Sequence, residues 1–189
     1  VYFHETEETR RNEIESLGGR VYKIHKPSLK DLINNKQIKL LFENNKSRWQ
    51  ALHIHAPHFA AFIAPAAKKA GINKICVHCH TTEFSLKGNP YRNKLLSLYA
   101  KYFVKDKFAC SKTAGELWYG AKPFTVLNNA IDCEKYRFNE QKRNEIRQSL
   151  DLTDKFVLCH IGRTDIPQKN HPFLFKVFAE VKMQKNNAV

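Results

Sequence analysis

The chain has 189 residues, of which 42% are hydrophobic and 12% are aromatic, and this apolar content excludes general disorder. Thirty-two lysines and arginines outnumber 18 acidic residues, so the net charge is +14. That excess suits nucleic acid, an anionic lipid surface or a phosphorylated substrate. The basic residues are spread along the whole sequence, which argues against a dedicated nucleic-acid arm. No apolar run approaches the roughly 18 residues that a membrane span needs.

Strand-like and helix-like segments alternate along the chain. The first part predicts a strand end at 1–4, a charged helix at 6–17 closed by Gly18-Gly19, a strand at 21–24, a helix from Ser28 to about residue 44, a strand at 51–55 and an alanine-rich helix at 60–70 stopped by Gly71. The second part predicts a strand at 74–80, a helix at 91–105, a strand at 107–110, a helix from Ser111 to Tyr119, a strand at 124–127, a polar helix at 140–150 and a buried strand at 156–161. This alternation with short connections predicts an α/β fold, a Rossmann-like parallel sheet with helices on both faces.

The polar helix at 140–150 and the residues that follow it resemble a connector between domains. We therefore place a domain boundary near residue 152. The sequence predicts one domain at 1–152 and the beginning of a second at 153–189, because so short a segment cannot form a domain of its own.

The segment after the last predicted strand has the composition of an anion site. The apolar run ends at Gly162, Arg163 follows at once, Lys169 comes six residues later, and Pro172 fits the first turn of a helix. Backbone N–H groups and the helix dipole favour an anion there, while the arginine offers a planar fork and the lysine a point charge. A solvated loop in a lysine-rich chain explains the residue types equally well. The strand–loop–helix context favours a diphosphate site.

Ligands of open parallel sheets bind beyond the carboxyl ends of the strands. That rule selects 55–58, 80–83, Ser111, 128–129 and 162–170. Among these, His80 and Glu83 leave a strand toward the expected cleft, where either could act as a general base or bind hydroxyl groups. A histidine whose ring is satisfied by a neighbouring carbonyl is the alternative.

Two histidine-containing patterns raise the question of a metal. Cys76-Val77-His78-Cys79-His80 matches the pattern of covalent haem attachment and could form part of a zinc site. On a strand, however, Cys76 and Cys79 face opposite sides and cannot share one tetrahedral ion. His53 and His55 share a strand face, so a metal pair is geometrically possible, although a strand end near a polar ligand is the commoner explanation. We expect no metal at either place.

The five cysteines also bear on the environment of the protein. They are odd in number, and four of them lie in or beside apolar, strand-like runs. Reduced thiols of a cytosolic protein fit this pattern better than a disulfide framework.

Three segments together closely resemble bacterial glycosyltransferases of family 4, above all those of capsular, exopolysaccharide and lipopolysaccharide assembly. They are FACSKTAGELWYG at 108–120, VLNNAIDCEKYRFNEQKRNEIRQSLDL at 126–152 and FVLCHIGRTDIPQKNHPFL at 156–174. The resemblance implies the GT-B fold, in which two Rossmann-like domains face each other across a cleft. The N-terminal domain then holds the acceptor, and the C-terminal domain binds the nucleotide-sugar donor.

The resemblance also implies roles for individual residues. Arg163 and Lys169 match the basic pair on the donor diphosphate, and His80 matches the cleft histidine that contacts the donor sugar. We expect all three to be catalytic. Arg163 and Lys169 act as cations fixed at the departing diphosphate, which stabilise the transition state more than the ground state, and His80 acts beside the reaction centre. Gly162 and Asn170 complete the donor-binding loop. The residues expected on the acceptor side of the cleft are His55, His58, Thr81, Glu83, Ser111 and Asn128.

The implied enzyme is of the hexosyltransferase type. It transfers a sugar with retention from a nucleotide-sugar, UDP-linked, to a glycan or lipid-linked acceptor in surface polysaccharide biosynthesis, without a metal or other cofactor. Its expected location is cytoplasmic, with peripheral contact to the anionic inner face of the plasma membrane and no nucleic-acid partner. The family's first glycine-rich loop and its acidic donor motif have no counterpart in the chain. We therefore expect an internal fragment that is inactive by itself.

Two other functions remain compatible with the residues. A non-catalytic basic module could bind nucleic acid, although no aromatic cluster among basic residues supports it. A nicotinamide-dependent oxidoreductase could use the same type of sheet, although the chain contains no Gly-x-Gly-x-x-Gly fingerprint.

Overall fold

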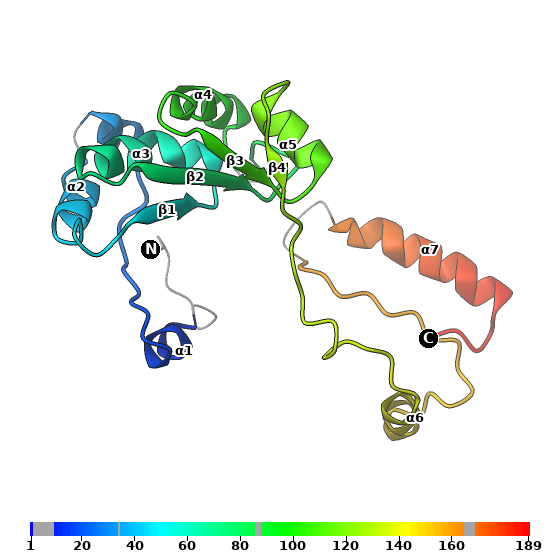
Figure 1. Ribbon diagram of the computed structural model, residues 1–189. Helices are drawn as coiled ribbons and strands as arrows, with labels where there is room; N and C mark the ends of the chain where they lie inside the picture. The colour runs from blue at the N-terminus through cyan, green and yellow to red at the C-terminus, as the bar shows by residue number, and fades with distance from the viewer. Residues whose placement is uncertain (2–9, 34, 86–87, 165–168) are drawn as a thin grey trace. The chain divides into compact units, whose positions relative to one another are not determined.

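The computed structural model describes residues 1, 10–33, 35–85, 88–164 and 169–189 (Figure 1). The chain divides into two compact units, Val1–Asn129 and Ala130–Val189. Among the described residues, no helix combines the length and the apolar character needed to cross a bilayer. The predicted domain boundary near residue 152 stays a prediction.

The first unit contains a four-stranded, all-parallel sheet (Figure 1). Its strands are β1 (Ala51–Ile54), β2 (Lys74–Cys79), β3 (Asp106–Ala109) and β4 (Thr125–Val126), and they lie side by side in chain order. The register pairs His53 with Cys76 and His78 with Phe108. The predicted Rossmann-like α/β class is therefore confirmed.

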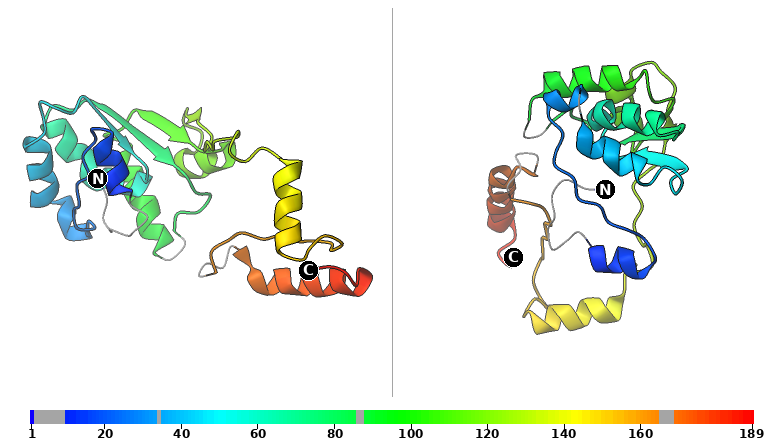
Figure 2. Two further views of the ribbon diagram at one scale, coloured as in Figure 1. Left: turned by 90° about the horizontal axis from the view of Figure 1, so that it is seen from below. Right: turned by 90° about the vertical axis from the view of Figure 1, so that its left-hand side faces the viewer.

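The core of this unit lies between the sheet and the helices that pack on it. Helices α3 (Ala60–Lys69) and α4 (Pro90–Ala100) lie side by side, and their buried residues form one cluster with Ile75 and Val77 of β2 (Figures 1 and 2). Alanines of α3 are almost fully buried, because their small side chains let the helix approach the sheet closely. Helix α5 (Lys112–Tyr119) packs against Cys79 in a second cluster.

These three helices meet the same side of β2. Ile75, Val77 and Cys79 alternate with Cys76 and His78, and successive side chains of a strand point to opposite faces. The other face of β2 therefore carries the side chains of Cys76 and His78. This face contains the histidines of the candidate site.

Local capping signals set several helix ends as predicted. The Ser111 side chain accepts a hydrogen bond from the Ala114 N–H at the start of α5, and Gly71 follows α3 with a φ of 87°. After α1 (Arg11–Ser16), Gly18 has a φ of 84°, as expected for a helix terminator. The remainder of the predicted helix at 6–17 and most of the strand end at 1–4 lie outside the described residues.

The prediction of one continuous helix from Ser28 to residue 44 is wrong, because the structure has two separate helices in this segment. Ser28 and Asp31 form a capping box, but it opens only a short 3-10 helix, Leu29–Leu32. Helix α2 (Lys36–Glu43) then starts afresh, with the Asn35 side chain accepting from the Ile38 N–H. The predicted strand at 21–24 is reduced to a single bridge residue, Lys23.

The second unit contains α6 (Glu140–Ser149) and α7 (His171–Gln184). The predicted buried strand at 156–161 is wrong, because Ile161 is 91% exposed and the segment makes only one parallel bridge, between Phe156 and Ala188. A buried parallel strand needs neighbours on both sides, whereas the described residues of this unit offer only 187–189 as a partner. Hydrogen bonds from Phe156 N to Asn187 O and from Leu158 N to Val189 O hold that edge, at 3.0 and 2.9 Å.

Candidate functional site

Four histidine side chains stand in a row on the sheet face opposite the helices. They belong to the ends of β1 and β2 and the residues directly after them: His53, His55, His78 and His80. Ring centroids lie 4.3 Å apart for His53 and His55, and 4.0 Å apart for His78 and His80. The two pairs that the sequence presents separately are thus one cluster, because β1 and β2 are neighbours. We call it the histidine ladder.

Hydrogen bonds fix the ring orientation of two members of the ladder. Asn129 Oδ1 lies 3.0 Å from His80 Nδ1, and His80 Nε2 lies 2.8 Å from His55 Nδ1. Since an amide oxygen only accepts, His80 Nδ1 carries the proton in this arrangement. In the neutral ring His80 Nε2 then holds a lone pair, which accepts from the N–H of His55 Nδ1. Asn129 therefore sets the tautomers of both rings.

Burial favours the neutral forms of His55 and His78. Desolvation lowers the pKa of His55 below its ordinary value, and the positive charge that neighbouring histidines acquire on protonation adds to this effect. Desolvation likewise lowers the pKa of His78, again with a contribution from His80 and His53. A neutral imidazole has a lone pair as well as an N–H group, so each of these two rings can both accept and donate a hydrogen bond.

His80 and His55 border a pocket of about 350 Å³ at the carboxyl ends of β1 and β2. Its other lining side chains come from the segments after these strands, from α4 and α5, and from the segment before the 3-10 helix at 29–32; they include Lys26, His58, Thr81, Glu83, Phe84, Arg92 and Trp118. The pocket combines cationic groups, hydroxyl and carboxylate groups, and aromatic rings. Such a lining can hold a polar ligand with ring-shaped apolar surfaces.

The loop after β2 is held in place by Trp118 of α5. The Trp118 indole N–H donates to the Thr81 carbonyl over 2.9 Å, and the Thr81 hydroxyl donates to the Glu83 carbonyl over 2.8 Å. His58 stacks on the same indole ring, with 6.1 Å between centroids. Desolvation, followed by the charges of Arg92 and Lys26, lowers the pKa of His58 to about 4. His58 is therefore neutral at physiological pH.

The structure brings five of the predicted residues together at this pocket, namely His55, His58, His80, Thr81 and Glu83. Two others do not line it. The Ser111 hydroxyl caps α5, and Asn128 is exposed beside Asn129, which makes the contact with His80. The sequence signal for Asn129 was present, since it follows a strand end as Asn128 does, but its contact depends on a histidine 49 positions away.

The predicted donor-side residues Gly162, Arg163, Lys169 and Asn170 belong to the second unit. Asn170 precedes α7 with a φ of 40°, and Pro172 occupies the first turn of that helix as predicted. The Arg163 carbonyl lies 3.1 Å from His171 Nε2, which ties the loop to the helix start. A side chain at Gly162 would come within 3.3 Å of the Lys169 stem, so glycine lets these segments approach. Residues 165–168 lie outside the described residues.

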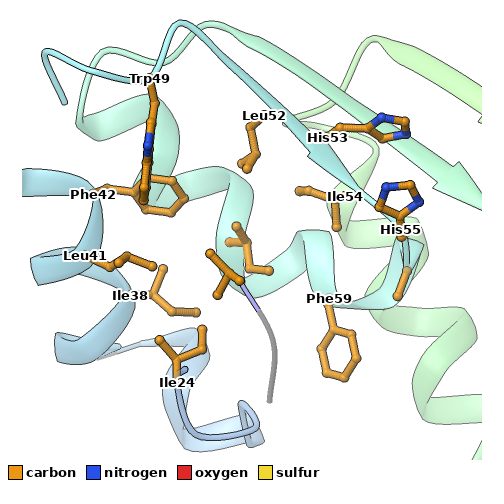
Figure 3. A pocket seen from close by; sticks show the side chains of 13 residues that line it. Ile24, Ile38, Leu41, Phe42, Trp49, Leu52, His53, Ile54, His55 and Phe59 are labelled. Carbon is orange, nitrogen blue, oxygen red and sulfur yellow. The ribbon is translucent and has the colours of Figure 1, made fainter. Parts of the chain in front are cut away.

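A second pocket, which the sequence did not indicate, adjoins the other end of the ladder. It measures about 290 Å³ and is lined mainly by apolar side chains such as Ile24, Ile38 and Phe42, with His53 and His55 on its border (Figure 3). It is therefore suited to apolar groups rather than to a nucleotide.

The prediction that Cys76 and Cys79 face opposite sides of the strand is confirmed. The Cys76 thiol faces the Leu52 carbonyl at 3.6 Å, whereas Cys79 is buried against α5 on the other side. All five cysteines are free. Burial raises the pKa of the Cys79 thiol to about 11, which makes it unreactive at neutral pH.

Comparison with known proteins adds one similarity. No family model matches the chain, and no solved structure matches it. A curated protein of Bacillus subtilis (strain 168), named "Putative glycosyltransferase EpsF", is 28% identical over 183 residues, covering 90% of this chain. The chain spans 46% of that relative's length. Over most of its residues, the chain is thus similar to a protein named as a glycosyltransferase.

Proposed function

We propose that this chain is part of a retaining glycosyltransferase of family 4 and GT-B fold, which transfers a sugar from a nucleotide-sugar to a glycan or lipid-linked acceptor in surface polysaccharide biosynthesis. The observation that carries the proposal is the pocket at the carboxyl ends of β1 and β2, bordered by His80 in a fixed tautomer. Similarity to a named glycosyltransferase supports the same class. The enzyme is of the hexosyltransferase type and works in the cytoplasm.

His80 has the role of binding the donor sugar. Its Nδ1–H is held by Asn129, and its Nε2 accepts from His55. A sugar hydroxyl replaces His55 as the donor to His80 Nε2 when the donor binds. The sugar hydroxyl then lies in a fixed direction, and fixing the reactant in this way lowers the entropic part of the barrier.

Arg163 and Lys169 have the role of binding the diphosphate, with Gly162 and Asn170 completing the loop at the start of α7. Both cations are exposed, and α7 is long enough for its N-terminus to favour an anion. As the sugar leaves, negative charge grows on the diphosphate of the departing nucleotide, UDP in this proposal. Fixed cations stabilise that charge, so the transfer requires neither a metal nor another cofactor.

The pocket has the role of receiving the acceptor. Lys26 and Arg92 can bind a phosphate of a lipid-linked glycan, and the Trp118 ring can stack on a sugar. Thr81, Glu83 and His58 supply hydrogen-bonding groups, and Ser111 and Asn128 stand at neighbouring strand ends. These side chains fit a polar, hydroxyl-rich acceptor and no nucleic acid.

Contact with the membrane is supported by the outer face of α4. Tyr91, Leu95 and Tyr99 are 79%, 67% and 44% exposed, and their spacing of four residues places them on one stripe of the helix. Lysines at 94 and 101 flank that stripe. An apolar stripe between lysines suits the anionic inner leaflet of the plasma membrane.

Vesicle sedimentation tests this contact. We expect the protein to bind vesicles that contain anionic lipid better than zwitterionic ones, and Leu95→Asp to lower the bound fraction. The matched control is Ile146→Asp on α6, which changes another exposed apolar residue, at 57% exposure. Equal binding by the Leu95 variant and its parent would remove the membrane contact from the proposal.

The reaction itself is tested with the protein at its natural length. It is incubated with a panel of nucleotide-sugars and a lipid-linked glycan acceptor, and the product's anomeric configuration is determined by NMR. We expect one donor to be used with retention. Transfer with inversion would contradict the retaining mechanism, and failure to use any nucleotide-sugar would contradict the proposed class.

A further inference from the structure

The histidine ladder has a feature that sugar transfer does not explain. His78 is only 4% exposed, and its Nε2 atom is shielded from solvent without a hydrogen-bond partner among the described residues. When the other ring nitrogen, Nδ1, carries the proton of the neutral ring, Nε2 holds a buried lone pair. A buried acceptor without a donor costs free energy, and a bound cation removes that cost.

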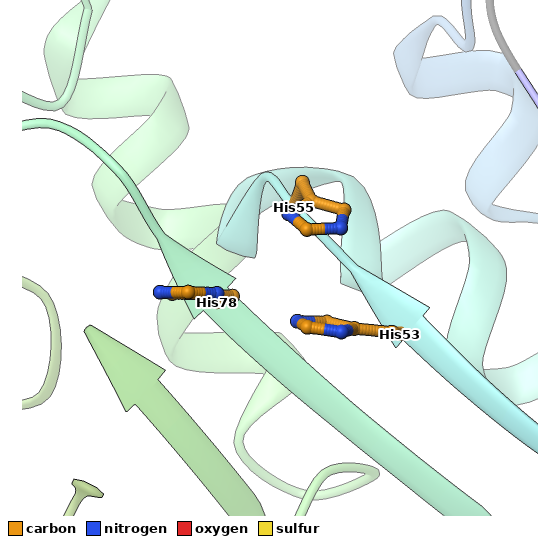
Figure 4. A group of neighbouring side chains, drawn as sticks. All are labelled: His53, His55 and His78. Atoms are coloured by element: carbon orange, nitrogen blue, oxygen red, sulfur yellow. The ribbon is translucent and has the colours of Figure 1, made fainter. Parts of the chain in front are cut away.

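Two more imidazoles lie beside this lone pair. His53, His55 and His78 each offer a ring nitrogen, and the three nitrogens lie within 4.8 Å of one another (Figure 4). The rings come from two adjacent strands whose register is fixed by the sheet. His53 and His55 are exposed and His78 is buried, and the bond from His55 to His80 holds the His55 ring.

The hydrogen bond between His55 and His80 leaves the other ring nitrogen of His55 available for a metal ion. Because His55 donates its Nδ1–H to His80, its lone pair lies on Nε2. A metal-binding histidine usually donates one ring N–H to a nearby acceptor and binds the metal through the other ring nitrogen.

We propose that His53, His55 and His78 bind a divalent transition metal ion of the Zn²⁺ class through three imidazole nitrogens. Zn²⁺ accepts nitrogen ligands at about 2.0–2.1 Å in a tetrahedral arrangement. The three nitrogens already lie within 4.8 Å of one another, and rotation of the exposed His53 ring brings them closer to that arrangement. Three imidazoles without a carboxylate exclude Mg²⁺ and Ca²⁺, which require oxygen ligands. The fourth position stays open to water or a ligand.

The site does not rest on the proposed transferase function. The transfer uses Arg163 and Lys169 in place of a metal, and His80 contacts the ion only through His55. Metal binding and sugar transfer can therefore succeed or fail independently.

Direct titration tests the site with the full chain, after removal of any affinity tag. Co²⁺ is added first, because its visible spectrum distinguishes four-coordinate from six-coordinate binding, and Zn²⁺ is then titrated against a chromophoric chelator. We expect one ion per chain and the intense visible bands of four-coordinate Co²⁺. His53→Gln, His55→Gln and His78→Gln should each weaken Zn²⁺ binding at least tenfold, whereas His160→Gln in the second unit should leave it unchanged.

Two results would overturn the proposal. One is the absence of stoichiometric binding by the parent chain, and the other is parent-like binding by all three ladder variants. Circular dichroism confirms that each variant is folded. The exposed positions of His53 and His55 make those two variants decisive even if His78→Gln does not fold.

Discussion

Asn129 sets the tautomer of His80, although no sequence pattern connects the two residues. Its amide oxygen accepts from His80 Nδ1, so the lone pair that a sugar hydroxyl would meet is always on Nε2. His80 and His55 could be selected from the sequence because they end apolar strands. The bond to Asn129 could not be selected, because it forms only when the end of β4 lies near the end of β2.

Replacing Asn129 tests this control. Asn129→Ala should lower kcat for transfer by about ten- to a hundredfold, the range seen for residues that orient a functional histidine, with little change in the donor KM. Asn129→Asp keeps an accepting oxygen and should recover most of the loss. Asn144→Ala on α6 is the control. A rise in KM together with the fall in kcat, without recovery by aspartate, would indicate a merely structural role.

His58 makes the stability of the first unit depend on pH. Its pKa is lowered to about 4 from an ordinary value of 6.5, so between these values the unfolded chain binds the proton more readily. Stability is therefore complete above about pH 6.5 and is lost as the pH falls toward 4, at no more than about 1.4 kcal/mol per pH unit. Partial exposure of the ring reduces this slope.

Urea unfolding at pH 7 and pH 5 measures that dependence. His58→Gln should reduce the loss of stability between the two pH values, because the glutamine does not titrate. His160→Gln, which changes an exposed histidine, should leave the loss as it is in the parent. An unchanged loss in the His58 variant would contradict the assignment.

At the scale of elements, local signals predicted most of the sheet and several helix ends. Apolar runs gave β1 to β4 within about one or two residues, and Ser111 and Gly71 marked helix ends through their own backbone and side-chain chemistry. The predicted helix from Ser28 failed because Asn35 is a second N-cap within it. The strand at 156–161 failed because burial depends on neighbours that no local pattern specifies.

Helix α5 positions the pocket through Trp118, and its packing depends on a glycine. A Cβ atom at Gly115 would overlap the ring of Phe124, which precedes β4. Gly115→Ala should therefore destabilise the chain by about 1–3 kcal/mol, despite the better helix propensity of alanine. Thr113→Ala on the exposed side of α5 should change the free energy of unfolding by less than about 0.5 kcal/mol. Denaturant unfolding checks both, and a stabilised Gly115 variant would contradict this packing.

At the scale of the whole molecule, the strand order β1-β2-β3-β4 brings residues that are far apart in the sequence together in one site. It aligns the ends of β1 and β2, so that the histidines after both strands line one pocket. The alternation of elements predicted the parallel sheet, but not which strands were adjacent. The ion pairs of lysine and arginine with glutamate among the described residues lie at the surface and contribute little to stability, so the net charge of +14 concerns partners rather than folding.

The proposed reaction requires residues from both units. His80 lies in the first unit and Arg163 in the second, and each is assigned to a different part of the same donor. Loss of either should therefore affect the same chemical step. Lys176 on α7 is exposed and has no assigned role, which makes it the matched control for charge.

The most direct measurement is the rate at which the protein at its natural length releases nucleoside diphosphate from its nucleotide-sugar in the presence of acceptor. We predict that His80→Ala and Arg163→Ala each lower this rate by about a hundredfold, since both remove groups that act on developing charge or on sugar orientation. Lys176→Ala should keep the parent rate. Parent-like rates for both His80→Ala and Arg163→Ala would contradict the account.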